Sequence, residues 1–363
     1  MDNVKPKILC FIDSLGAGGA QRQLVGLACF LKEKGYDVTL ACYHDNPFYV
    51  DQLAAGGVHY LYMEKARKSA FRLWYVARYF RHLKPDVVIA YLATPSICAC
   101  VARLFNHRFK LIVSERSTTQ HTGRNERIRF RLFRRADCVV PNAYSQEAYI
   151  RNTFPKLSGK IVTIPNFVDL EHFVPPLKRC RREVPEVVVA ASVRACKNTL
   201  GLIEAVSALK AKGYHFHISW YGLNKEYAEY VNRCGQMIER LGVAGYIELK
   251  EKTTSIRNVY QSADYFCLPS FYEGTPNVIG EAMACGLPVV CSDVCDNARY
   301  VVEGENGFLF NPKDTDSIAS AFERLFALGD EGYITYCRNS RTLAEQKLSK
   351  EAFVNAYLKL IEE

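Results

Sequence analysis

Two glutamates stand eight positions apart in the segment 268–290, and their type and setting suit the binding of a sugar. Glu273 falls in a stretch that we predict as a loop, and Glu281 falls one turn inside the helix that follows it. An ionised carboxylate only accepts hydrogen bonds, so it suits the hydroxyl groups of a sugar or a ribose, which donate them. Two glutamates at this spacing are also common, so the pair alone favours a segment with no function.

The residues between the two glutamates could bind a phosphate. Gly274 and Thr275 belong to the predicted loop, and Pro276 begins the predicted helix, where proline suits the first turn. The backbone N–H groups near Asn277 and Val278 then lie at a helix N-terminus, whose dipole favours an anion. We therefore expect one carboxylate in a loop, one on a helix, and a phosphate site in the same space.

A second candidate is the glycine-rich loop at residues 13–21, after the first predicted strand. Gly18 and Gly19 would let the backbone approach a ligand at the start of a helix. A dinucleotide-binding pattern that began at Gly16 would need glycine at position 21, where Gln21 stands. The loop thus fits contact with a phosphate or an acceptor, or a tight turn, better than a nicotinamide or flavin site.

The elements that must position these residues alternate short β-branched strands with longer helices, which is typical of a parallel sheet with crossover helices. The apolar stretch 87–102 is interpreted as a strand, a loop at 94–96 and a helix. In the first half we predict strands at 7–12, 37–42, 58–61, 86–90, 111–113, 138–140 and 161–164, and helices at 20–34, 69–82, 96–105, 124–134 and 145–151.

The alternation stops at a proline-rich basic stretch, 174–182, and then restarts. The second half is predicted to hold strands at 187–192, 215–221, 246–249, 265–268 and 288–291, and helices at 200–210, 226–241, 256–262, 278–285, 315–328 and 350–361. The expected fold class is α/β, with two doubly wound Rossmann-like domains facing a cleft, because ligands bind outside the carboxyl ends of such strands. The expected bounds are 1–170 for the first domain, 171–185 for a linker, 186–345 for the second domain, and 346–363 for a C-terminal helix that packs back on the first domain.

Composition excludes several classes of protein. The chain has 363 residues, of which 49% are apolar and 23% charged, and this usage excludes a disordered chain, a coiled coil and a collagen-like repeat. The fourteen cysteines are scattered and none has the C-x-x-C spacing of a zinc or redox site, so we expect a reduced, cytoplasmic compartment and no metal. No targeting segment is visible, and no run reaches the roughly 20 apolar residues of a spanning helix.

The net charge of +9 is concentrated in residues 61–135, which hold seventeen Lys or Arg and four Asp or Glu. Aromatic residues such as Phe71, Trp74 and Tyr79 are interleaved with them. Such a basic patch suits an anionic membrane surface, and the alternative is an ordinary solvated helix face. We expect no nucleic-acid partner, because no RNA- or DNA-binding module accompanies the charge.

The segment 268–290, taken as one unit, resembles the E-x7-E signature of the retaining glycosyltransferases of the GT-B fold, family four. That family usually has P-S-x-x-E-G-x-P-x-x-x-x-E-A-M-A-x-G-x-P-V-V, and every fixed position is matched from Pro269 to Val290. Residues 16–22 are similar to the family's G-G-A-E-R loop, with Gln21 in place of Glu, and residues 166–169 are similar to its N-G-V-D. The resemblance extends over nearly the whole chain.

The resemblance implies roles for several residues. Glu281 would hold the ribose of the donor, and Glu273 would lie against the donor sugar. Residues 191–198 look like the family's G-R-x-x-x-K-[GN], so Arg194 and Lys197 would hold the donor diphosphate and stabilise its departure without a metal or other cofactor. A solvated charge cluster at a strand end is the alternative for this pair. The implied donor-binding set is Glu281, Gly274, Thr275, Pro276, Asn277, Val278, Gly18 and Gly19.

Two positions depart from the family pattern. Many members carry a histidine after about the fifth strand, whereas residues 113–117 are similar to an S-E-R-N variant and leave either Glu115 or Arg116 to face the donor sugar or the acceptor. Lys250 replaces a glycine after the strand at 246–249, next to the expected base pocket. The implied catalytic set is Glu273, Arg194, Lys197 and Glu115.

The implied activity is that of a hexosyl- or N-acetylhexosaminyl-type transferase. It would move a sugar from a nucleotide-sugar, with UDP favoured, to a hydroxyl of a glycan or lipid-linked oligosaccharide in polysaccharide, lipopolysaccharide or glycoconjugate biosynthesis. We expect a cytoplasmic protein that binds peripherally to the inner face of the membrane. The alternatives are a non-catalytic nucleotide-sugar-binding protein and a glycosidase that uses the carboxylate pair, whose two carboxyl groups would stand about 5–9 Å apart.

Overall fold

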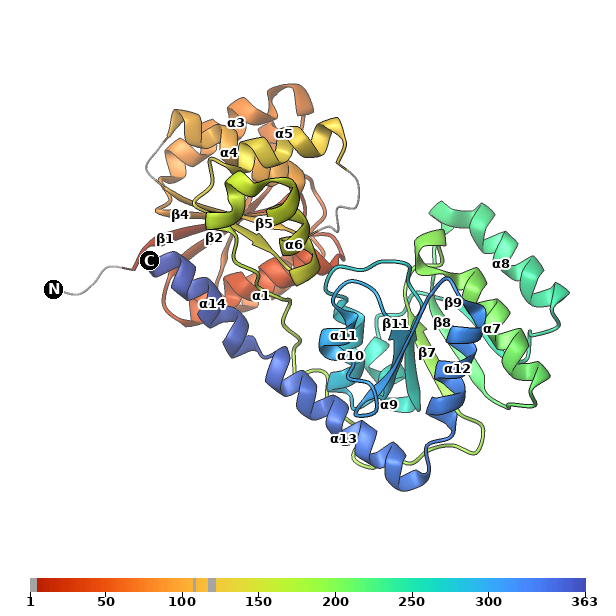
Figure 1. Cartoon of the computed structure of the whole chain (residues 1–363). Coiled ribbons are helices and arrows are strands. Elements are labelled where there is room, and N and C mark those ends of the chain that lie inside the picture. Colours follow the sequence, from red (N-terminus) through yellow and green to blue (C-terminus); the bar gives the residue numbers. More distant parts are fainter. Residues whose placement is uncertain (1–4, 107–108, 117–121) are drawn as a thin grey trace. The chain divides into compact units, whose positions relative to one another are not determined.

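The computed structural model describes residues 5–106, 109–116 and 122–363. It divides into two compact units, each with its own parallel sheet (Figure 1). Unit 1 comprises Met1–Asn166 together with Glu351–Glu363, and unit 2 comprises Phe167–Lys350. The stretch 171–185, where a linker is expected, falls inside unit 2 and holds neither a helix nor a strand.

Unit 1 contains a six-stranded parallel sheet in the order β3-β2-β1-β4-β5-β6. Its strands are β1 (Lys7–Phe11), β2 (Asp37–Cys42), β3 (His59–Tyr62), β4 (Val87–Tyr91), β5 (Lys110–Glu115) and β6 (Cys138–Pro141). Its α-helices are α1 (Gly19–Glu33), α2 (Val50–Ala55), α3 (Arg72–Leu83), α4 (Ala93–Phe105), α5 (Arg124–Phe133), α6 (Tyr144–Thr153) and most of α14 (Lys350–Glu362), and its 3-10 turns are η1 (Glu64–Ala66), η2 (Ser69–Phe71) and η3 (Pro155–Lys160).

Helices cover both faces of this sheet, which is why the central strands are runs of apolar residues rather than alternating ones. Figure 1 shows α3, α4 and α5 together on one face, with α1 on the other. Under α3 to α5 the core is built by large side chains such as Phe11, Phe80 and Phe133, each fully buried.

Unit 2 contains a second six-stranded parallel sheet, in the order β12-β11-β10-β7-β8-β9. Its strands are β7 (Glu186–Ala190), β8 (His217–Leu223), β9 (Ile247–Glu251), β10 (Tyr265–Leu268), β11 (Val289–Ser292) and β12 (Gly307–Phe310). Its α-helices are α7 (Thr199–Ala211), α8 (Ala228–Arg240), α9 (Ile256–Ser262), α10 (Asn277–Ala284), α11 (Asn297–Tyr300), α12 (Thr315–Phe326) and α13 (Asp330–Lys347), and its 3-10 turns are η4 (Ala195–Lys197) and η5 (Lys225–Tyr227).

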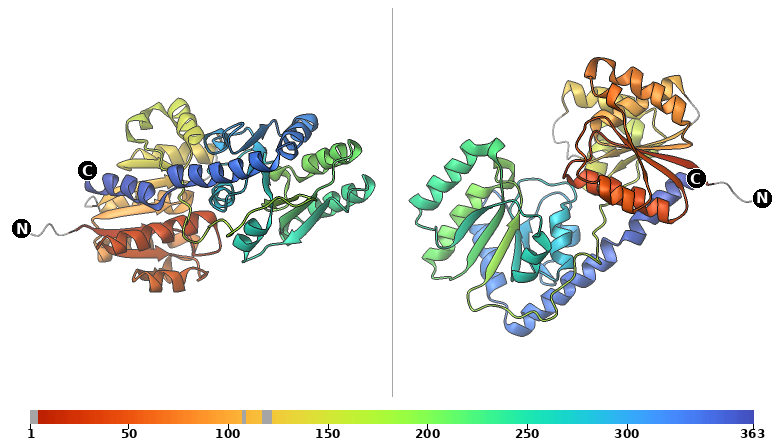
Figure 2. Two further views of the ribbon diagram at one scale, coloured as in Figure 1. Left: turned by 90° about the horizontal axis from the view of Figure 1, so that it is seen from below. Right: turned by 180° about the vertical axis from the view of Figure 1, so that it is seen from behind.

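Two cores lie on the two faces of the second sheet. The core that contains Trp220 joins the sheet to α7, α8 and α12, and the core that contains Met283 joins it to α9 and α10. Both views of Figure 2 show α7 and α8 on the face opposite α10.

The two sheets have the same topology. When the second is counted from β9, both run third, second, first, fourth, fifth, sixth in chain order. The strand order therefore reverses between β1 and β4 in unit 1, and between β7 and β10 in unit 2. Ligands of doubly wound sheets bind outside the carboxyl ends of the strands at such a reversal. The α/β prediction with two doubly wound domains is confirmed.

Some predicted elements were wrong. The loop expected at 94–96 lies inside α4, because Pro95 falls in the first turn, where its missing N–H costs the helix nothing. The strand expected at 161–164 is only an isolated bridge from Ile161 to Val139. The sequence analysis also missed α2, α11, α13 and β12, which are short or strongly polar.

The last helix returns to unit 1, where residues 351–363 belong. Its Tyr357 is fully buried and its hydroxyl forms a hydrogen bond of 2.8 Å with that of Tyr91 at the end of β4. The hydroxyl of Tyr36 donates a hydrogen bond to Glu362 near the end of the helix. This helix therefore contacts unit 1 both at the end of β4 and at the start of β2.

Among the residues that the structure describes, no helix is both long enough and apolar enough to cross a membrane. All fourteen cysteines are free thiols, and most are buried. Burial raises the pKa of Cys98 to about 11, so this thiol stays protonated and unreactive near neutral pH.

Candidate functional site

The loops that follow β7 and β10 meet at the reversal of strand order in unit 2. The N–H of Phe271, after β10, donates a hydrogen bond of 3.0 Å to the carbonyl of Cys196, after β7. The first loop is held in place by Asn198, whose backbone is left-handed (φ 57°) and whose amide donates to the carbonyl of Pro312 at 2.7 Å. Asparagine tolerates this conformation better than most residues. The two loops thus form one connected rim.

Glu273 and Lys197 form an ion pair across this rim. Their side chains are 11% and 15% exposed, so the pair is mostly shielded but open to solvent on one side. The hydroxyl of Ser270 also donates to the Glu273 carboxylate, at 2.5 Å. The carboxylate predicted to lie against a sugar is therefore oriented by two donors from two different loops.

Arg194 lies beside this pair, directly before η4. Burial lowers the pKa of Arg194, but a hydrogen bond with Tyr227 and nearby acidic groups outweigh burial and raise it, so the guanidinium stays charged. Its Nε is buried and has no hydrogen-bond partner among the described residues. A buried N–H without a partner is costly and is satisfied when an acceptor arrives. The group is suited to bind an anion.

The helix α10 starts directly after the Glu273 loop. Pro276 is its N-cap and is buried, so the first-turn amides belong to Asn277 and Val278, between the predicted starts at 276 and 278. Gly274 and Thr275 form the turn into the helix, and Thr275 is 8% exposed. The peptide N–H groups of a first helical turn are not used inside the helix and favour a phosphate.

Glu281 lies one turn further along α10 and is 3% exposed. The hydroxyl of Tyr260 in α9 donates to its carboxylate at 3.5 Å. On the same helix, a Cβ at Gly280 would lie 2.7 Å from side-chain atoms of Val168 and Leu348. The helix is thus packed closely within unit 2, and the Glu281 carboxylate is held in a fixed position.

The glycine loop of unit 1 joins β1 to α1. Gly18 is the N-cap of α1, and Gly19 is its first residue and is exposed. The amide of Gln21 donates to Asp13 at 3.4 Å, and the N–H of Ser14 donates to the same carboxylate oxygen at 2.6 Å. The loop is a tight turn. Because its glycines have no side chains, they do not cover the start of α1.

The structure places Glu115 away from solvent. It is 1% exposed and forms an ion pair of 3.3 Å with Arg129 of α5, which is itself 8% exposed. This position does not suit a carboxylate that touches a sugar, and it does suit one that holds α5 against the end of β5.

Arg116 is also committed to its own unit. It donates to Asn166 at 2.7 Å and to the hydroxyls of Tyr357, at 2.8 Å, and Tyr91. Ser117, the last residue of the quoted 113–117 motif, lies outside the described residues.

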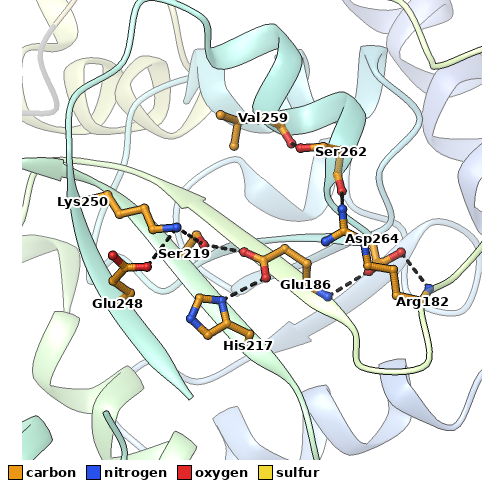
Figure 3. A network of polar contacts seen from close by, with 9 residues as sticks. All are labelled: Arg182, Glu186, His217, Ser219, Glu248, Lys250, Val259, Ser262 and Asp264. Carbon is orange, nitrogen blue, oxygen red and sulfur yellow. Dashed lines mark hydrogen bonds and ion pairs between the residues drawn. The ribbon is translucent and has the colours of Figure 1, made fainter. Parts of the chain in front are cut away.

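Lys250, which departs from the family pattern, belongs to a polar network on one face of the second sheet (Figure 3). It pairs with Glu248 at 3.0 Å and donates to the hydroxyl of Ser219 at 3.0 Å. Ser219 and His217 both contact the carboxylate of Glu186, the latter at 2.9 Å. Because Glu186 stands between the serine and the histidine, the three do not form a nucleophile–base arrangement.

No group of three or more His, Cys, Asp or Glu able to hold a metal ion occurs in residues 5–106, 109–116 and 122–363. The charged groups of the candidate site are one guanidinium, one ammonium and two carboxylates, and a helix N-terminus lies beside them.

Comparisons with known proteins identify the family. A model described as "Glycosyltransferase Family 4" matches residues 17–172, and one described as "Glycosyl transferases group 1" matches residues 184–327. The chain belongs to the group 1, or family 4, glycosyltransferases. The two matched ranges together include every candidate residue of both units.

Relatives and solved structures agree with the assignment. The chain is 25% identical, over 86% of its length and 88% of the relative's, to the N-acetylgalactosamine-N,N'-diacetylbacillosaminyl-diphospho-undecaprenol 4-alpha-N-acetylgalactosaminyltransferase of Campylobacter jejuni. A glycosyltransferase from Rickettsia africae shares the fold with a TM-score of 0.86 at 16% identity, with 98% of each chain covered. HepE of Anabaena, solved with UDP-glucose, shares it with a TM-score of 0.84 at 18% identity, with 98% of this chain and 99% of that chain covered. The fold of this glycosyltransferase is GT-B.

Sequence reasoning missed three residues that hold the site together. Ser270 orients Glu273, Tyr227 contacts Arg194, and Tyr260 contacts Glu281. Ser270 stands in the recognised signature and could have been found there. Tyr227 and Tyr260 lie on other elements, 33 and 21 positions from their partners, and no spacing pattern connects them.

Proposed function

We propose that this glycosyltransferase moves a sugar from a nucleotide-sugar, with UDP favoured, to an acceptor hydroxyl with retention of anomeric configuration. The observation that carries the proposal is the rim of unit 2, where Arg194, Lys197 and the N-terminus of α10 adjoin the Glu273 carboxylate. A sugar diphosphate needs cationic and N–H donors for its phosphates and acceptors for its hydroxyls, and the rim supplies both.

Arg194 and Lys197 act on the diphosphate. Charge develops on the leaving diphosphate as the glycosidic bond breaks, and fixed cations in a shielded site stabilise that charge without reorganising. The ion pair with Glu273 fixes the position of the Lys197 ammonium at the rim. The first-turn amides of α10 add further donors, and the proposed reaction needs no metal ion.

The two glutamates act on hydroxyl groups. Glu273, oriented by Ser270 and Lys197, accepts hydrogen bonds from the donor sugar, and Glu281 accepts them from the ribose. Gly274, Thr275 and the glycine loop with Gly18 and Gly19 let main chain approach the donor. We assign no protein nucleophile.

Glu115 takes a different part in this proposal. Its burial and its ion pair with Arg129 support a positioning role, in which it fixes α5 and the end of β5. Arg116 fixes Asn166 and the last helix in the same way. Neither residue is proposed to touch the donor.

The acceptor is proposed to be a glycan or a lipid-linked oligosaccharide, and the transferred sugar a hexose or N-acetylhexosamine. Support comes from the Campylobacter relative, whose name specifies a diphospho-undecaprenol acceptor, and from the basic patch 61–135, which suits an anionic membrane surface. These features favour cell-surface polysaccharide or lipopolysaccharide biosynthesis by a protein bound peripherally to the cytoplasmic face of a membrane, with no nucleic-acid partner.

The test is product analysis with a panel of UDP-, GDP- and dTDP-sugars and lipid-linked acceptors. We expect one nucleotide-sugar to be consumed, with release of its nucleoside diphosphate and extension of the acceptor, in the absence of added metal. Nucleotide binding without consumption of any donor would indicate a non-catalytic binding protein. Release of sugar from an oligosaccharide without nucleotide would indicate a glycosidase.

A further inference from the structure

A second cavity with its own charges lies in unit 1, between α5, the end of α6 and η3. Its volume is about 560 Å³. A neighbouring cavity of about 420 Å³ shares Thr122, Arg127 and Arg131 with it. The residues that line the larger cavity are Thr122, Arg127, Phe130, Arg131, Arg134, Thr153, Phe154, Pro155, Lys156 and Leu157.

The cations of this cavity are not used by the protein itself. Among the described residues, the charged groups of Arg127, Arg131, Arg134 and Lys156 have neither a hydrogen bond nor an ion pair, and the lining contains no acidic residue. Elsewhere in the basic patch some cations are paired, as Arg103 is with Asp137, and others, such as Lys65 and Arg124, likewise have no partner among the described residues. Four like charges around one hollow repel one another, and an anion that binds there removes that repulsion.

The floor of the cavity is apolar. Phe130 is 1% exposed, and its ring lies 4.5 Å, between centroids, from that of Phe154. Pro155 and the buried Leu157 extend this surface. A small inorganic anion would bind the cations at the rim and leave the floor in contact with water. A ligand that has both a phosphate group and an apolar chain would contact the cations and the apolar floor together.

We propose that this cavity binds a diphosphate ester of an apolar alcohol, with the diphosphate among Arg127, Arg131 and Lys156 and the first carbons of the chain against Phe130 and Phe154. Arginine suits this task because its guanidinium can donate two parallel hydrogen bonds to one phosphate group. The cavity lies in unit 1, and the proposed donor site lies in unit 2.

A groove between α3 and α4 is the competing surface. Its volume is about 680 Å³ and it is lined by apolar residues that include Trp74 and Phe105, together with Arg78 and Arg81. These two arginines already have partners, since Arg78 lies over the ring of Trp74 and Arg81 donates to the carbonyl of Phe105 at 3.4 Å. The α5 cavity is therefore the better site for a diphosphate, and the α3–α4 groove provides a matched control.

The identification of this ligand as the anchor of the acceptor rests on the proposed function, whereas the binding site itself does not. In a lipid-linked acceptor the reacting hydroxyl is on the sugar and the diphosphate is at the other end. A site that holds the diphosphate would select acceptors by the distance between their diphosphate and their reacting hydroxyl.

The experiment measures binding without any donor, by calorimetry on the full chain, with farnesyl diphosphate, farnesol and inorganic pyrophosphate as probes. We expect farnesyl diphosphate to bind more tightly than either fragment. The R127Q/R131Q variant should weaken it by about tenfold or more, because two charge-assisted contacts are lost, whereas R78Q/R81Q should change it by less than about twofold. Equal binding of pyrophosphate and farnesyl diphosphate, or equal loss in both variants, would overturn the proposal.

A second arm separates a soluble diphosphate from a lipid headgroup. Flotation with phosphatidylcholine vesicles, with and without phosphatidylglycerol, measures attraction to an anionic surface. If R127Q/R131Q loses vesicle binding while keeping its affinity for farnesyl diphosphate, the cavity is part of a membrane surface and the proposal is wrong. UDP affinity, measured on the same variants, should be unchanged, so a failure here is distinguishable from a failure of the donor site.

Discussion

The two units share one topology but differ in how far their strand-end ion pairs are shielded from solvent. In unit 1 the polar residues at the strand ends are bonded to one another, as in the Glu115–Arg129 pair and the contacts of Arg116 with two tyrosines. In unit 2 the corresponding rim pairs Lys197 with Glu273, whose side chains are 15% and 11% exposed, against 9% and 1% for Arg129 and Glu115. The strand-end ion pair is therefore closed to solvent in unit 1 and partly open to solvent in unit 2.

This difference separates two kinds of perturbation. Substitutions at the strand ends of unit 1 should act on stability, and substitutions at the rim of unit 2 should act on the donor. Four predictions test that separation, and each compares a variant with a matched control.

The largest effect is expected for Arg129→Met in unit 1. It leaves the Glu115 carboxylate buried without its cation, which typically costs about 3–5 kcal/mol of unfolding free energy. Chemical denaturation measures the loss. The double variant E115Q/R129M should recover much of it, and Lys359→Met, whose pair with Glu363 is exposed, should cost less than about 0.5 kcal/mol. A small loss for Arg129→Met would show that the pair is not structural.

In unit 2, Arg194→Gln should lower kcat by about 100- to 1000-fold. This is the usual effect of removing one preorganised hydrogen-bond donor that stabilises the charge of a transition state. Unfolding free energy should change little. Steady-state kinetics with saturating donor measure the effect, and Arg233→Gln on the exposed side of α8 is the control. An unchanged kcat would remove Arg194 from the catalytic set.

Glu281→Gln should raise the Kd for UDP by about tenfold or more, because a hydrogen bond to a charged group contributes about 1.5–3 kcal/mol. Glu273→Gln should weaken the binding of the UDP-sugar more than that of UDP, because its carboxylate is proposed to contact the sugar and acts on the diphosphate only through Lys197. Calorimetry with both ligands distinguishes the two residues. If both variants lose UDP affinity equally, the separate ribose and sugar roles are wrong.

The smallest effect concerns pH and compares one carboxylate from each unit. Burial raises the pKa of Asp137, but the hydrogen bonds from Arg103 and from the N–H of Leu111 outweigh burial and lower it. In the same way, the N–H of Leu309 and Arg324 outweigh burial and lower the pKa of Glu303.

A carboxyl group whose pKa is lower in the folded state stabilises the protein above its unfolded pKa, about 3.9 for Asp and 4.3 for Glu, and loses that effect as the pH falls through the folded value. Asp137→Asn should therefore cost about 1 kcal/mol at pH 7, and Glu303→Gln less, because Glu303 is more exposed and more screened by solvent. Thermal unfolding from pH 7 to pH 3 measures both. A cost that does not shrink toward pH 3 would contradict the assignment.

The local elements could largely be predicted from sequence. The strand β2 (Asp37–Cys42) and the strand β10 (Tyr265–Leu268) have the predicted bounds, because buried parallel strands are short β-branched or aromatic runs that end at polar residues. The long helix α13 was missed, because its sequence DEGYITYCRNSRTLAEQK has no clear apolar stripe. Its Tyr333 and Cys337 are nevertheless buried in the core around Trp220.

The candidate site could be predicted only in part. Glu273 and Lys197 are 76 positions apart, and only the recognised motifs placed them in one site, which the ion pair between them now supports. The position of Glu115 could not be predicted, because its partner Arg129 appears in the sequence as one of many arginines in a basic helix. Whether a charge at a strand end is paired or available depends on a tertiary contact that neither spacing nor composition records.

The return of residues 351–363 to unit 1 affects how the chain is made. A ribosome releases the first 166 residues long before the final helix is translated, so Tyr91 and Arg116 must wait for Tyr357 through the synthesis of all of unit 2. During that interval the hydroxyl of Tyr91 and the guanidinium of Arg116 lack the hydrogen-bond partner that Tyr357 later supplies, so unit 1 is completed only after unit 2 has been synthesised.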